Sequence, residues 1–283
     1  MSIQDFIDDF LSQVLRDFKS HIEPVDSICS LKKLNYENTQ TPDYRNAIMR
    51  EYYLLRYFYA YFTEYYHIYR SMIRENHLKA PLSVASIGCG AGIDYYSLNF
   101  AVPHSLENFT YQGFDLIDWG FRGNNLQTDF LQTNISDISL QNINVLMFPK
   151  SLSEFSEDDF NTFVDNLSPQ KFQDTICIVS SMMNEGGKHD IERIKILEKK
   201  LCQYDYQSLN SSDKTYAPKA ESCYHVISAR CPDCVTEYLA QLKDLCIQTA
   251  SQCVACQINK SPILRTEHIR YQTLFLTKAG AVK

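Results

Sequence analysis

The sequence lacks any run of basic residues. Its 283 residues include 27 basic and 34 acidic side chains, a formal net charge of −7, and contain no block of five or more lysines and arginines. Proteins that bind nucleic acid through its phosphates normally present a clustered positive face. The charge pattern therefore favours a small molecule or a protein over nucleic acid as the partner of this chain.

Long apolar segments are also missing. No stretch reaches the roughly 20 uncharged apolar residues that cross a bilayer, and the best candidate, residues 52–62, contains Arg56. The first nine residues carry acidic side chains where a secretion signal needs basic ones. We therefore expect a cytoplasmic protein with no membrane segment, whose ten cysteines are reduced thiols.

Four of the cysteines form two Cys-x-x-Cys pairs, at Cys231, Cys234, Cys253 and Cys256. This spacing is compatible with a four-cysteine zinc site. However, residues 235–249 have the pattern of one helix about 22 Å long, which keeps the pairs apart unless the chain doubles back. The expected strand at 253–258 also points its two cysteines to opposite faces. We therefore predict no metal ligands and keep zinc as an alternative.

Residues 1–79 are expected to form an N-terminal helical extension. Apolar residues repeat at helical spacing over 6–18, and a second helix is expected over 43–76, with Thr41 as its N-cap and Pro42 in its first turn. This second segment holds nine of the nineteen tyrosines. Such a face lies either in the core, the commoner case, or under a half-wet pocket.

From residue 80 onward, short β-branched runs alternate with helical patterns, which is typical of a parallel sheet with helical crossovers. The expected strands are 82–87, 110–115, 125–130, 143–148, 175–181 and 270–277. A capping box at Ser156 predicts a helix that begins there. The stretch at about 184–230 breaks the alternation, so we expect it to be an inserted lobe of a domain that covers 80–283.

A strand-to-helix turn carries glycines at Gly88, Gly90 and Gly92, with Cys89 between the first two. Glycine permits positive φ and lets the backbone approach a ligand closely, and the helix that follows offers free N–H groups. A dinucleotide-binding fingerprint would need glycine at the position of Ile93. The turn therefore predicts a ligand site and disfavours a nicotinamide-dependent enzyme.

Two acidic residues follow at the expected ends of the next two strands. Asp115 stands 23 residues beyond Gly92, where an acid at a strand tip can accept hydrogen bonds from both hydroxyls of a ribose. Asp129, followed by Phe130, ends the expected third strand. Together with the glycine turn, these residues indicate an adenosine-containing ligand.

At these positions the sequence resembles the class I S-adenosylmethionine-dependent methyltransferases. The turn that includes Cys89 is similar to the first motif of that family, Asp115 with Leu116 to its ribose acid, and Asp129-Phe130 to its adenine-edge motif. The resemblance covers 80–182 well and 232–278 loosely. It implies a doubly wound, Rossmann-like, seven-stranded and mostly parallel α/β sheet that binds S-adenosyl-L-methionine and transfers its methyl group to an unidentified acceptor.

The sequence departs from the family at Ser86. The family often has an acid two residues before the first glycine, where it helps to hold the amino group of the cofactor's methionine. Serine can still form a hydrogen bond there, so we keep Ser86 among the cofactor-binding residues. The departure leaves an alternative open, in which the protein is a catalytically inactive member of this fold that serves as a binding or adaptor module.

The residues after the expected strand 143–148 are the candidates for catalysis. Family members that methylate amino groups of bases or glutamine commonly carry Asn/Asp-Pro-Pro-aromatic here, whereas this chain has Phe148-Pro149-Lys150-Ser151. We predict Lys150 and Glu154 as catalytic residues at the carboxyl edge of the sheet. Lys150 would be an electrostatic anchor, or a base if burial lowered its pKa. The alternative is that both are solvated surface residues.

Overall fold

The computed structural model forms two compact units, residues 1–63 with 224–266 and residues 64–223 with 267–283. The division after residue 63 falls inside the helix Ala47–Arg74, whereas the expected boundary was after residue 79. The structure describes residues 1–22, 28–35, 42–75, 77–78, 80–106, 108–121, 128–182, 187–212, 215–216, 227–242, 258, 260–264 and 269–280.

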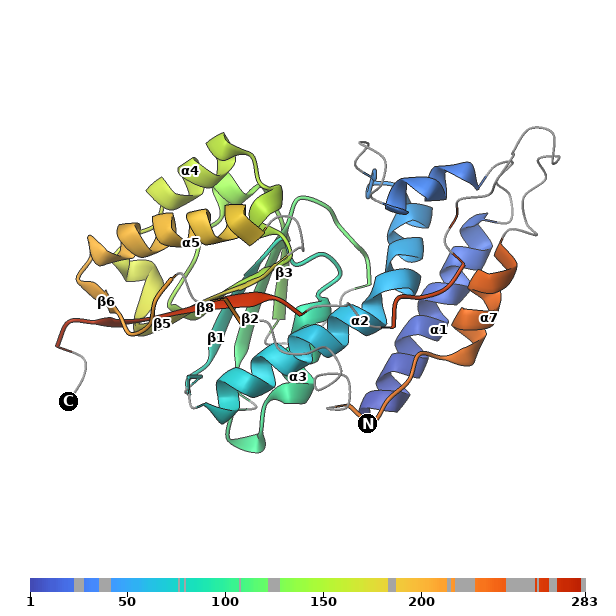
Figure 1. Ribbon diagram of the computed structural model, residues 1–283, viewed down its shortest axis with the longest axis horizontal. Helices are drawn as coiled ribbons and strands as arrows, with labels where there is room; N and C mark the ends of the chain where they lie inside the picture. Colours follow the sequence, from blue (N-terminus) through green and yellow to red (C-terminus); the bar gives the residue numbers. More distant parts are fainter. Residues whose placement is uncertain are drawn as a thin grey trace. The chain divides into compact units, whose positions relative to one another are not determined.

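The second unit is built on one mixed sheet (Figure 1). Its path runs in the order β3-β2-β1-β4-β5-β8-β6, and a short strand, β7, pairs with β8 beside it. The strands are β1 (Ser83–Ile87), β2 (Thr110–Asp115), β3 (Thr128–Gln132), β4 (Ile143–Pro149), β5 (Phe172–Ser181), β6 (Tyr206–Ser208), β7 (Thr215–Tyr216) and β8 (Tyr271–Lys278). The first five are parallel and β8 runs antiparallel to both of its main neighbours.

This strand order confirms the expected α/β class, a doubly wound and mostly parallel Rossmann-like sheet with an antiparallel strand near one edge. The order reverses between β1 and β4, since the chain goes from β1 outward to β3 and then returns to pair β4 with β1. In such sheets, ligands bind beyond the carboxyl ends of the strands at the point of reversal. The glycine turn follows β1 and Lys150 follows β4, so both candidate segments lie at this point.

Helices cover both faces of the sheet (Figure 1). One face is covered by α4 (Glu157–Asp165) and α5 (Gly187–Cys202), over an apolar core that includes Ile87, Phe114, Leu146, Phe148 and Ile178. The other face meets α3 (Ile93–Ala101) and the end of α2 (Ala47–Arg74). On that face the Tyr111 hydroxyl donates to Asp94 of α3, and Cys177 lies 3.7 Å from the sulfur of Met72.

Short 3-10 helices connect several of these elements. They are η1 (Cys29–Asn35), η2 (His104–Leu106), η3 (Ile135–Asp137), η4 (Leu152–Glu154) and η5 (Pro169–Lys171). The expected capping box before α4 is confirmed, because the Ser156 hydroxyl accepts a hydrogen bond from the backbone N–H of Asp159 at 3.1 Å. This cap fixes where the chain leaves η4 and turns into α4.

The first unit is helical and consists of α1 (Ile3–Ile22), η1, the first part of α2 and α7 (Asp233–Gln241). The rings of Phe6 and Phe10 in α1 pack on Phe58 in α2, and the centroids of Phe10 and Phe58 are 4.3 Å apart. Several tyrosines of α2 are buried, and the Tyr57 hydroxyl donates to the carbonyl of Leu34 at 3.1 Å. The packing interpretation of the tyrosine-rich helix therefore holds for these residues.

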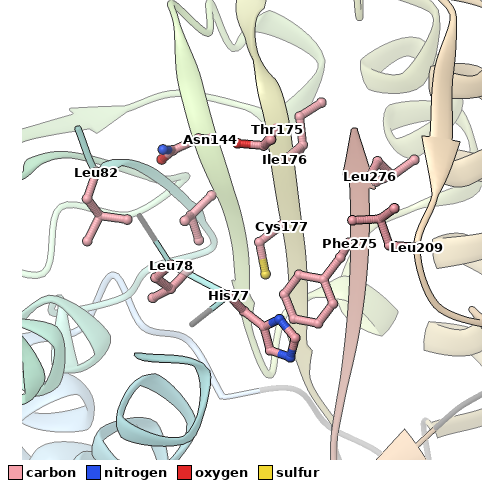
Figure 2. A pocket seen from close by; sticks show the side chains of 11 residues that line it. His77, Leu78, Leu82, Asn144, Thr175, Ile176, Cys177, Leu209, Phe275 and Leu276 are labelled. Atoms are coloured by element: carbon pink, nitrogen blue, oxygen red, sulfur yellow. The ribbon is translucent and has the colours of Figure 1, made fainter. Parts of the chain in front are cut away.

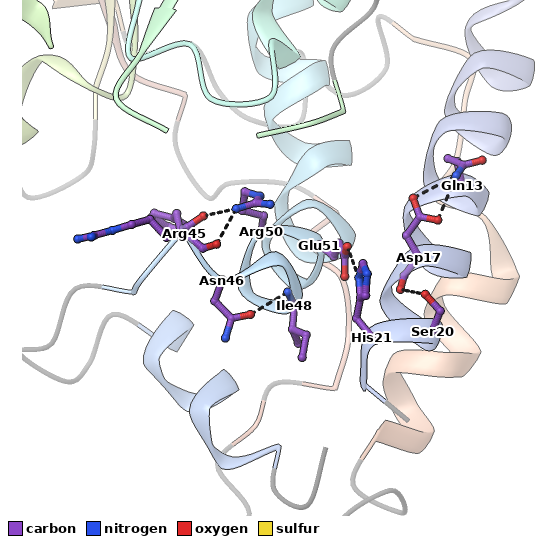
Figure 3. Close-up of polar contacts among 10 residues, drawn as sticks. Gln13, Asp17, Ser20, His21, Arg45, Asn46, Ile48, Arg50 and Glu51 are labelled. Atoms are coloured by element: carbon purple, nitrogen blue, oxygen red, sulfur yellow. Dashed lines mark hydrogen bonds and ion pairs between the residues drawn. The ribbon is translucent and has the colours of Figure 1, made fainter. Parts of the chain in front are cut away.

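The start of α2 differs from the expectation. The predicted N-cap, Thr41, lies outside the described residues, and the helix begins at Ala47 because the Asn46 side chain accepts a hydrogen bond from the N–H of Ile48 at 2.9 Å (Figure 3). Figure 3 also shows the buried Glu51 next to His21 at the end of α1, with 2.8 Å between Nδ1 and Oε1.

Three other expectations concern the rest of the chain. Helix α5 and strand β6 fall in the stretch expected to be an inserted lobe at about 184–230, and they belong to the sheet unit, since β6 pairs with β8. The third strand occupies 128–132 instead of 125–130. The helix expected at 235–249 is described only as α7, and the strand expected at 253–258 falls almost wholly outside the described residues. Within the part of the chain that the structure describes, no helix has the length and apolar character needed to cross a membrane.

Candidate functional site

The glycine turn has left-handed backbone at all three glycines, with φ of 70° at Gly88, 56° at Gly90 and 75° at Gly92. This is the region that glycine adopts at little cost and other residues rarely enter. The backbone N–H groups of Gly88 and Cys89 both donate to the carbonyl of Phe114, at 2.7 and 3.1 Å. The turn is therefore held against the carboxyl end of β2.

The three glycines have different surroundings. A Cβ on Gly88 would lie 2.4 Å from the Cβ of Ser151, and one on Gly92 would lie 2.9 Å from the ring of Phe130. A Cβ on Gly90 would meet only the indole ring of Trp119, at 3.6 Å or more. Gly88 and Gly92 are thus required by packing, whereas Gly90 keeps space in front of its backbone.

Asp115 ties this turn to the loop after β2. Its carboxylate accepts hydrogen bonds from the N–H of Gly90 at 2.8 Å, from the N–H of Ile117 at 2.8 Å and from the indole of Trp119 at 3.3 Å. The next residue, Leu116, exposes 65% of its surface, which is unusual for a large apolar side chain. An acid and an exposed apolar residue therefore stand side by side at the carboxyl edge.

Two of the residues predicted to bind the cofactor are buried near the carboxyl edge of the sheet. Ser86 is fully buried in β1, and Cys89 is 4% exposed. The structure adds Asp94, in the first turn of α3, which is fully buried and accepts the Tyr111 hydroxyl at 2.9 Å. Burial raises the pKa of Asp94 to about 6. The only sequence signal for Asp94 was an acid in the first turn of the helix after the glycines.

The structure does not place Asp129 at the carboxyl end of β3. In the pairing of β2 with β3, Asp115 lies opposite Gln132. Asp129 lies opposite Gln112, which is three residues before Asp115. Phe130 packs under the turn, where its ring fills the space beside Gly92. The expectation was wrong in register because the edge strand is partly exposed and continues to Gln132, whose side chain donates to the carbonyl of Leu116 at 3.1 Å.

Lys150 lies in a buried polar contact instead of facing water. Its backbone is left-handed, with φ of 59°, and its Nζ lies 2.7 Å from Glu64 Oε1 of α2 and 3.3 Å from the Met182 carbonyl. Glu64 is fully buried and also accepts the Ser181 hydroxyl at 2.6 Å. Lys150 is therefore engaged as an ammonium group that joins α2 to the ends of β4 and β5.

Glu154 lies in η4, which packs between the glycine turn and α5. On one side the Ser151 hydroxyl donates to the carbonyl of Ile87; on the other, the Arg193 guanidinium donates to the carbonyls of Leu152 and Phe155. The side chain of Glu154 reaches solvent. Surrounding protein and then the negative charges of Asp115 and Asp190 raise the pKa of Glu154 to about 7.

Asp190, in the first turn of α5, was not predicted from the sequence. It is 1% exposed, and burial raises its pKa to about 6 although the Ser153 hydroxyl, Arg193 and Lys150 act in the opposite direction. Among the residues that the structure describes, its buried Oδ1 has no hydrogen-bond partner. Many helices that follow a strand have an acid in their first turn, so this pattern alone could not identify Asp190 as a site residue.

A second region, at the amino ends of the strands, forms a cavity of about 110 Å³ (Figure 2). Leu78, Leu82 and Cys177 line it, and the His77 ring stacks on Phe275 with 3.9 Å between centroids. Because it lies at the opposite ends of β1 and β4 from the glycine turn, it is separate from the candidate cofactor site.

The described residues contain no group of three or more His, Cys, Asp or Glu side chains arranged to hold a metal ion. Cys231 is buried and Cys234 is exposed, and burial raises the pKa of Cys231 to about 11. Cys253 and Cys256 lie outside the described residues. The four-cysteine zinc alternative is therefore not tested by the structure.

Comparison with known proteins found no matching family model and no matching curated sequence. Among solved structures, the plantazolicin methyltransferase BpumL, in complex with a desmethyl-plantazolicin analogue and S-adenosylhomocysteine (SAH), is 14% identical, with 94% of this chain and 99% of that chain covered at a TM-score of 0.45. A TehB-like methyltransferase from Corynebacterium glutamicum is 11% identical, with 74% and 87% covered at a TM-score of 0.40. A methyltransferase from Aquifex aeolicus is 14% identical, with 50% and 81% covered at a TM-score of 0.37.

The strand order has its reversal after β1 and an antiparallel β8, in agreement with the doubly wound, mostly parallel sheet with a final antiparallel strand that the sequence resemblance implied. The chain has a doubly wound, Rossmann-like α/β fold.

Proposed function

We propose that this protein is an S-adenosylmethionine (SAM)-dependent methyltransferase whose cofactor binds at the glycine turn. The observation that supports this most directly is the bond between Asp115 and the N–H of Gly90, with the exposed Leu116 beside it. In this proposal Asp115 serves the ribose, Leu116 the base and the backbone of Gly90 the rest of the cofactor, all at the reversal point of the sheet.

The cofactor contacts follow from the chemistry of these groups. The backbone of Gly90 has room for the cofactor's methionine portion, Asp115 accepts from the ribose hydroxyls, and Leu116 packs on the adenine ring. A carboxylate offers about four acceptor positions, three of which are used by protein N–H groups. The longest of these bonds, from Trp119 at 3.3 Å, is the one that a ribose hydroxyl can replace most readily.

Glu154 and Lys150 are proposed for the transfer step in different roles. Methyl transfer depends mainly on the alignment of the nucleophile with the sulfonium methyl group. Glu154, with its raised pKa, can take a proton from the acceptor near neutral pH. Lys150 is held by Glu64 and is a positioning residue. The acceptor is a small molecule or a protein.

An adaptor without catalysis is the second candidate function. It is favoured by one observation: Trp119 is 6% exposed, lies over Gly90 and bonds the carboxylate of Asp115, so the chain's own side chain occupies part of the proposed site. If Trp119 stays in this position, the protein has the fold but does not bind the cofactor.

Isothermal titration with SAM, SAH and a nicotinamide dinucleotide separates these functions. We expect SAM and SAH to bind and the dinucleotide not to bind. Gly90→Val should abolish binding, because its side chain fills the approach to the backbone. The matched control is Gly280→Val, since Gly280 also has positive φ, 87°, with nothing within 4 Å of an added Cβ. Absence of SAM and SAH binding to the unmodified protein would establish the adaptor.

A further inference from the structure

The carboxyl edge of the sheet collects acids from three separate elements. Asp115 ends β2, Glu154 lies in η4, and Asp190 lies in the first turn of α5. Asp190 and Arg193 are both buried and stand one helical turn apart, so they share a face of α5. Because Arg193 bonds the carbonyls of Leu152 and Phe155, that face is directed at η4, which contains Glu154.

The cations near these acids are engaged elsewhere. The ammonium of Lys150 lies 2.7 Å from Glu64, and the guanidinium of Arg193 donates to two main-chain carbonyls. His189, the other basic group that acts on Asp190, is exposed on the same helix. Without a ligand, the carboxyl edge of the sheet therefore carries more negative than positive charge.

One oxygen of this acidic group is without a partner. Asp190 is 1% exposed, yet its Oδ1 accepts no hydrogen bond from the residues that the structure describes. Leaving a buried acceptor unsatisfied is costly, and more so for a charged group. Such an oxygen is suited to a ligand that brings both a positive charge and an N–H donor.

We propose, on the basis of the proposed function, that the acceptor is a protonated aliphatic amine, whose ammonium binds to Asp190 and passes a proton to Glu154. The ammonium R–NH₃⁺ gives one proton to the Glu154 carboxylate and becomes R–NH₂. The nitrogen lone pair then attacks the methyl carbon of SAM, and the electrons of the breaking C–S bond stay on sulfur. The products are neutral SAH and R–NH₂⁺–CH₃, and Glu154 returns its proton to solvent.

Other acceptor classes fit this edge less well. A carboxylate acceptor would be repelled by the three acids. An aliphatic hydroxyl has no positive charge to satisfy Asp190, and its proton is held too strongly for a carboxylate to remove. An amine meets both conditions, because its charge is attracted to the edge and the loss of one proton frees its lone pair. The raised pKa of Glu154, about 7, brings it closer to that of the ammonium it must deprotonate.

The positive group at Asp190 has a second possible source, the α-ammonium of the cofactor's own methionine. SAH distinguishes the two sources because it carries that ammonium but no acceptor. If Asp190 serves the acceptor, Asp190→Asn should leave SAH affinity unchanged by calorimetry. If the variant loses SAH affinity while wild type binds SAH, the ammonium belongs to the cofactor and the proposal fails.

The test uses the full chain and four probes with one carbon skeleton: butylamine, butanol, butanethiol and butanoate. Transfer of label from methyl-labelled SAM is measured for each, together with binding of butylammonium to SAH-saturated protein. We expect label on butylamine alone, and loss of butylammonium binding in Asp190→Asn. Glu154→Gln should lower transfer about a hundredfold at pH 7.5 and regain it as the pH approaches about 10.5, the ordinary pKa of an alkylammonium, where the amine loses its proton unaided.

The matched controls are Glu192→Gln, exposed on α5 two residues from Asp190, and Asp158→Asn, exposed at the start of α4. Both should behave as wild type. The proposal is overturned if another probe takes the label in place of butylamine, or if butylammonium binds equally to wild type and Asp190→Asn. It is equally overturned if no probe takes label and butylammonium does not bind. Failure of SAH to bind at all would instead remove the proposed function.

Discussion

Trp119 is the single tryptophan of the chain, and it lies against Gly90 with its indole nitrogen 3.3 Å from the carboxylate of Asp115. We predict that cofactor binding displaces this indole from its 6%-exposed position, because a ribose hydroxyl competes for the same oxygen. Titration with SAH should therefore shift tryptophan emission to longer wavelength. Trp119→Phe should lose the signal and retain calorimetric binding. Binding of SAH to wild type with unchanged emission would contradict the displacement.

A second residue-scale prediction concerns Asp94, whose pKa burial raises to about 6 from an ordinary value of 3.8. A raised pKa means that the folded protein holds this proton more tightly, so the stabilisation is complete below pH 3.8 and is lost as the pH rises through 6. The loss amounts to about 3 kcal/mol for a shift of this size. Asp94→Asn keeps an acceptor for Tyr111 and removes the ionisation.

Urea unfolding of wild type and Asp94→Asn at pH 4.5 and 7.5 checks this prediction. The difference in unfolding free energy between the two proteins should change in favour of the variant at the higher pH. Asp158→Asn, on an exposed position, serves as the control that should follow wild type. An identical pH dependence in Asp94→Asn and wild type would show that the buried carboxyl does not titrate in this range.

At the scale of elements, the contact among Glu64, Lys150 and Ser181 connects α2 to the ends of β4 and β5. Removing one charge of a buried pair leaves the other uncompensated, at a cost of about 3–5 kcal/mol. Glu64→Gln and Lys150→Met should each lower the unfolding free energy by about this amount. The double variant should lose much less than the sum. Additive losses in denaturant unfolding would mean that the two side chains do not act as a pair.

The elements also show how far the sequence could predict this site. Strands β1 and β4 are buried, largely apolar runs, so their positions and the residues just after them were predictable from pattern alone. The edge strand β3 has exposed positions and no such run, which is why Asp129 was placed three residues too far toward the carboxyl end. The start of α2 depended on one local bond, from Ile48 to Asn46, that no periodicity reports.

The polar contacts of the site could not be predicted for a different reason. Glu64 and Lys150 are 86 positions apart in the chain, and only the packing of α2 on the sheet brings them together. Likewise, the orientation of Asp190 toward η4 follows from Arg193 and its bonds to two carbonyls. The glycines and Asp115 were recognisable because they lie at the ends of two predicted strands, whereas the contacts of Glu64, Lys150 and Asp190 depend on tertiary structure.

For the whole molecule, a ligand that binds only the folded state raises its stability by mass action. SAH at a hundred times its dissociation constant should add about 2.7 kcal/mol to the unfolding free energy, visible as a rise in Tm. Asp115→Asn should need at least about tenfold more SAH for the same rise, since charge-assisted hydrogen bonds contribute about 1.5–3 kcal/mol each. Asp118→Asn, exposed in the same loop, should match wild type. Equal SAH dependence in all three proteins would exclude Asp115 from the site.

The placement of β8 has a consequence for how the chain is made. This strand, residues 271–278, lies between β5 and β6, and the helical unit likewise needs residues 224–266 to join residues 1–63. Neither unit can be completed on the ribosome until these later segments have been synthesised. Until then β5 presents an unpaired edge that invites association with other chains. We therefore expect nascent chains that stop before Tyr271 to depend on chaperones for solubility.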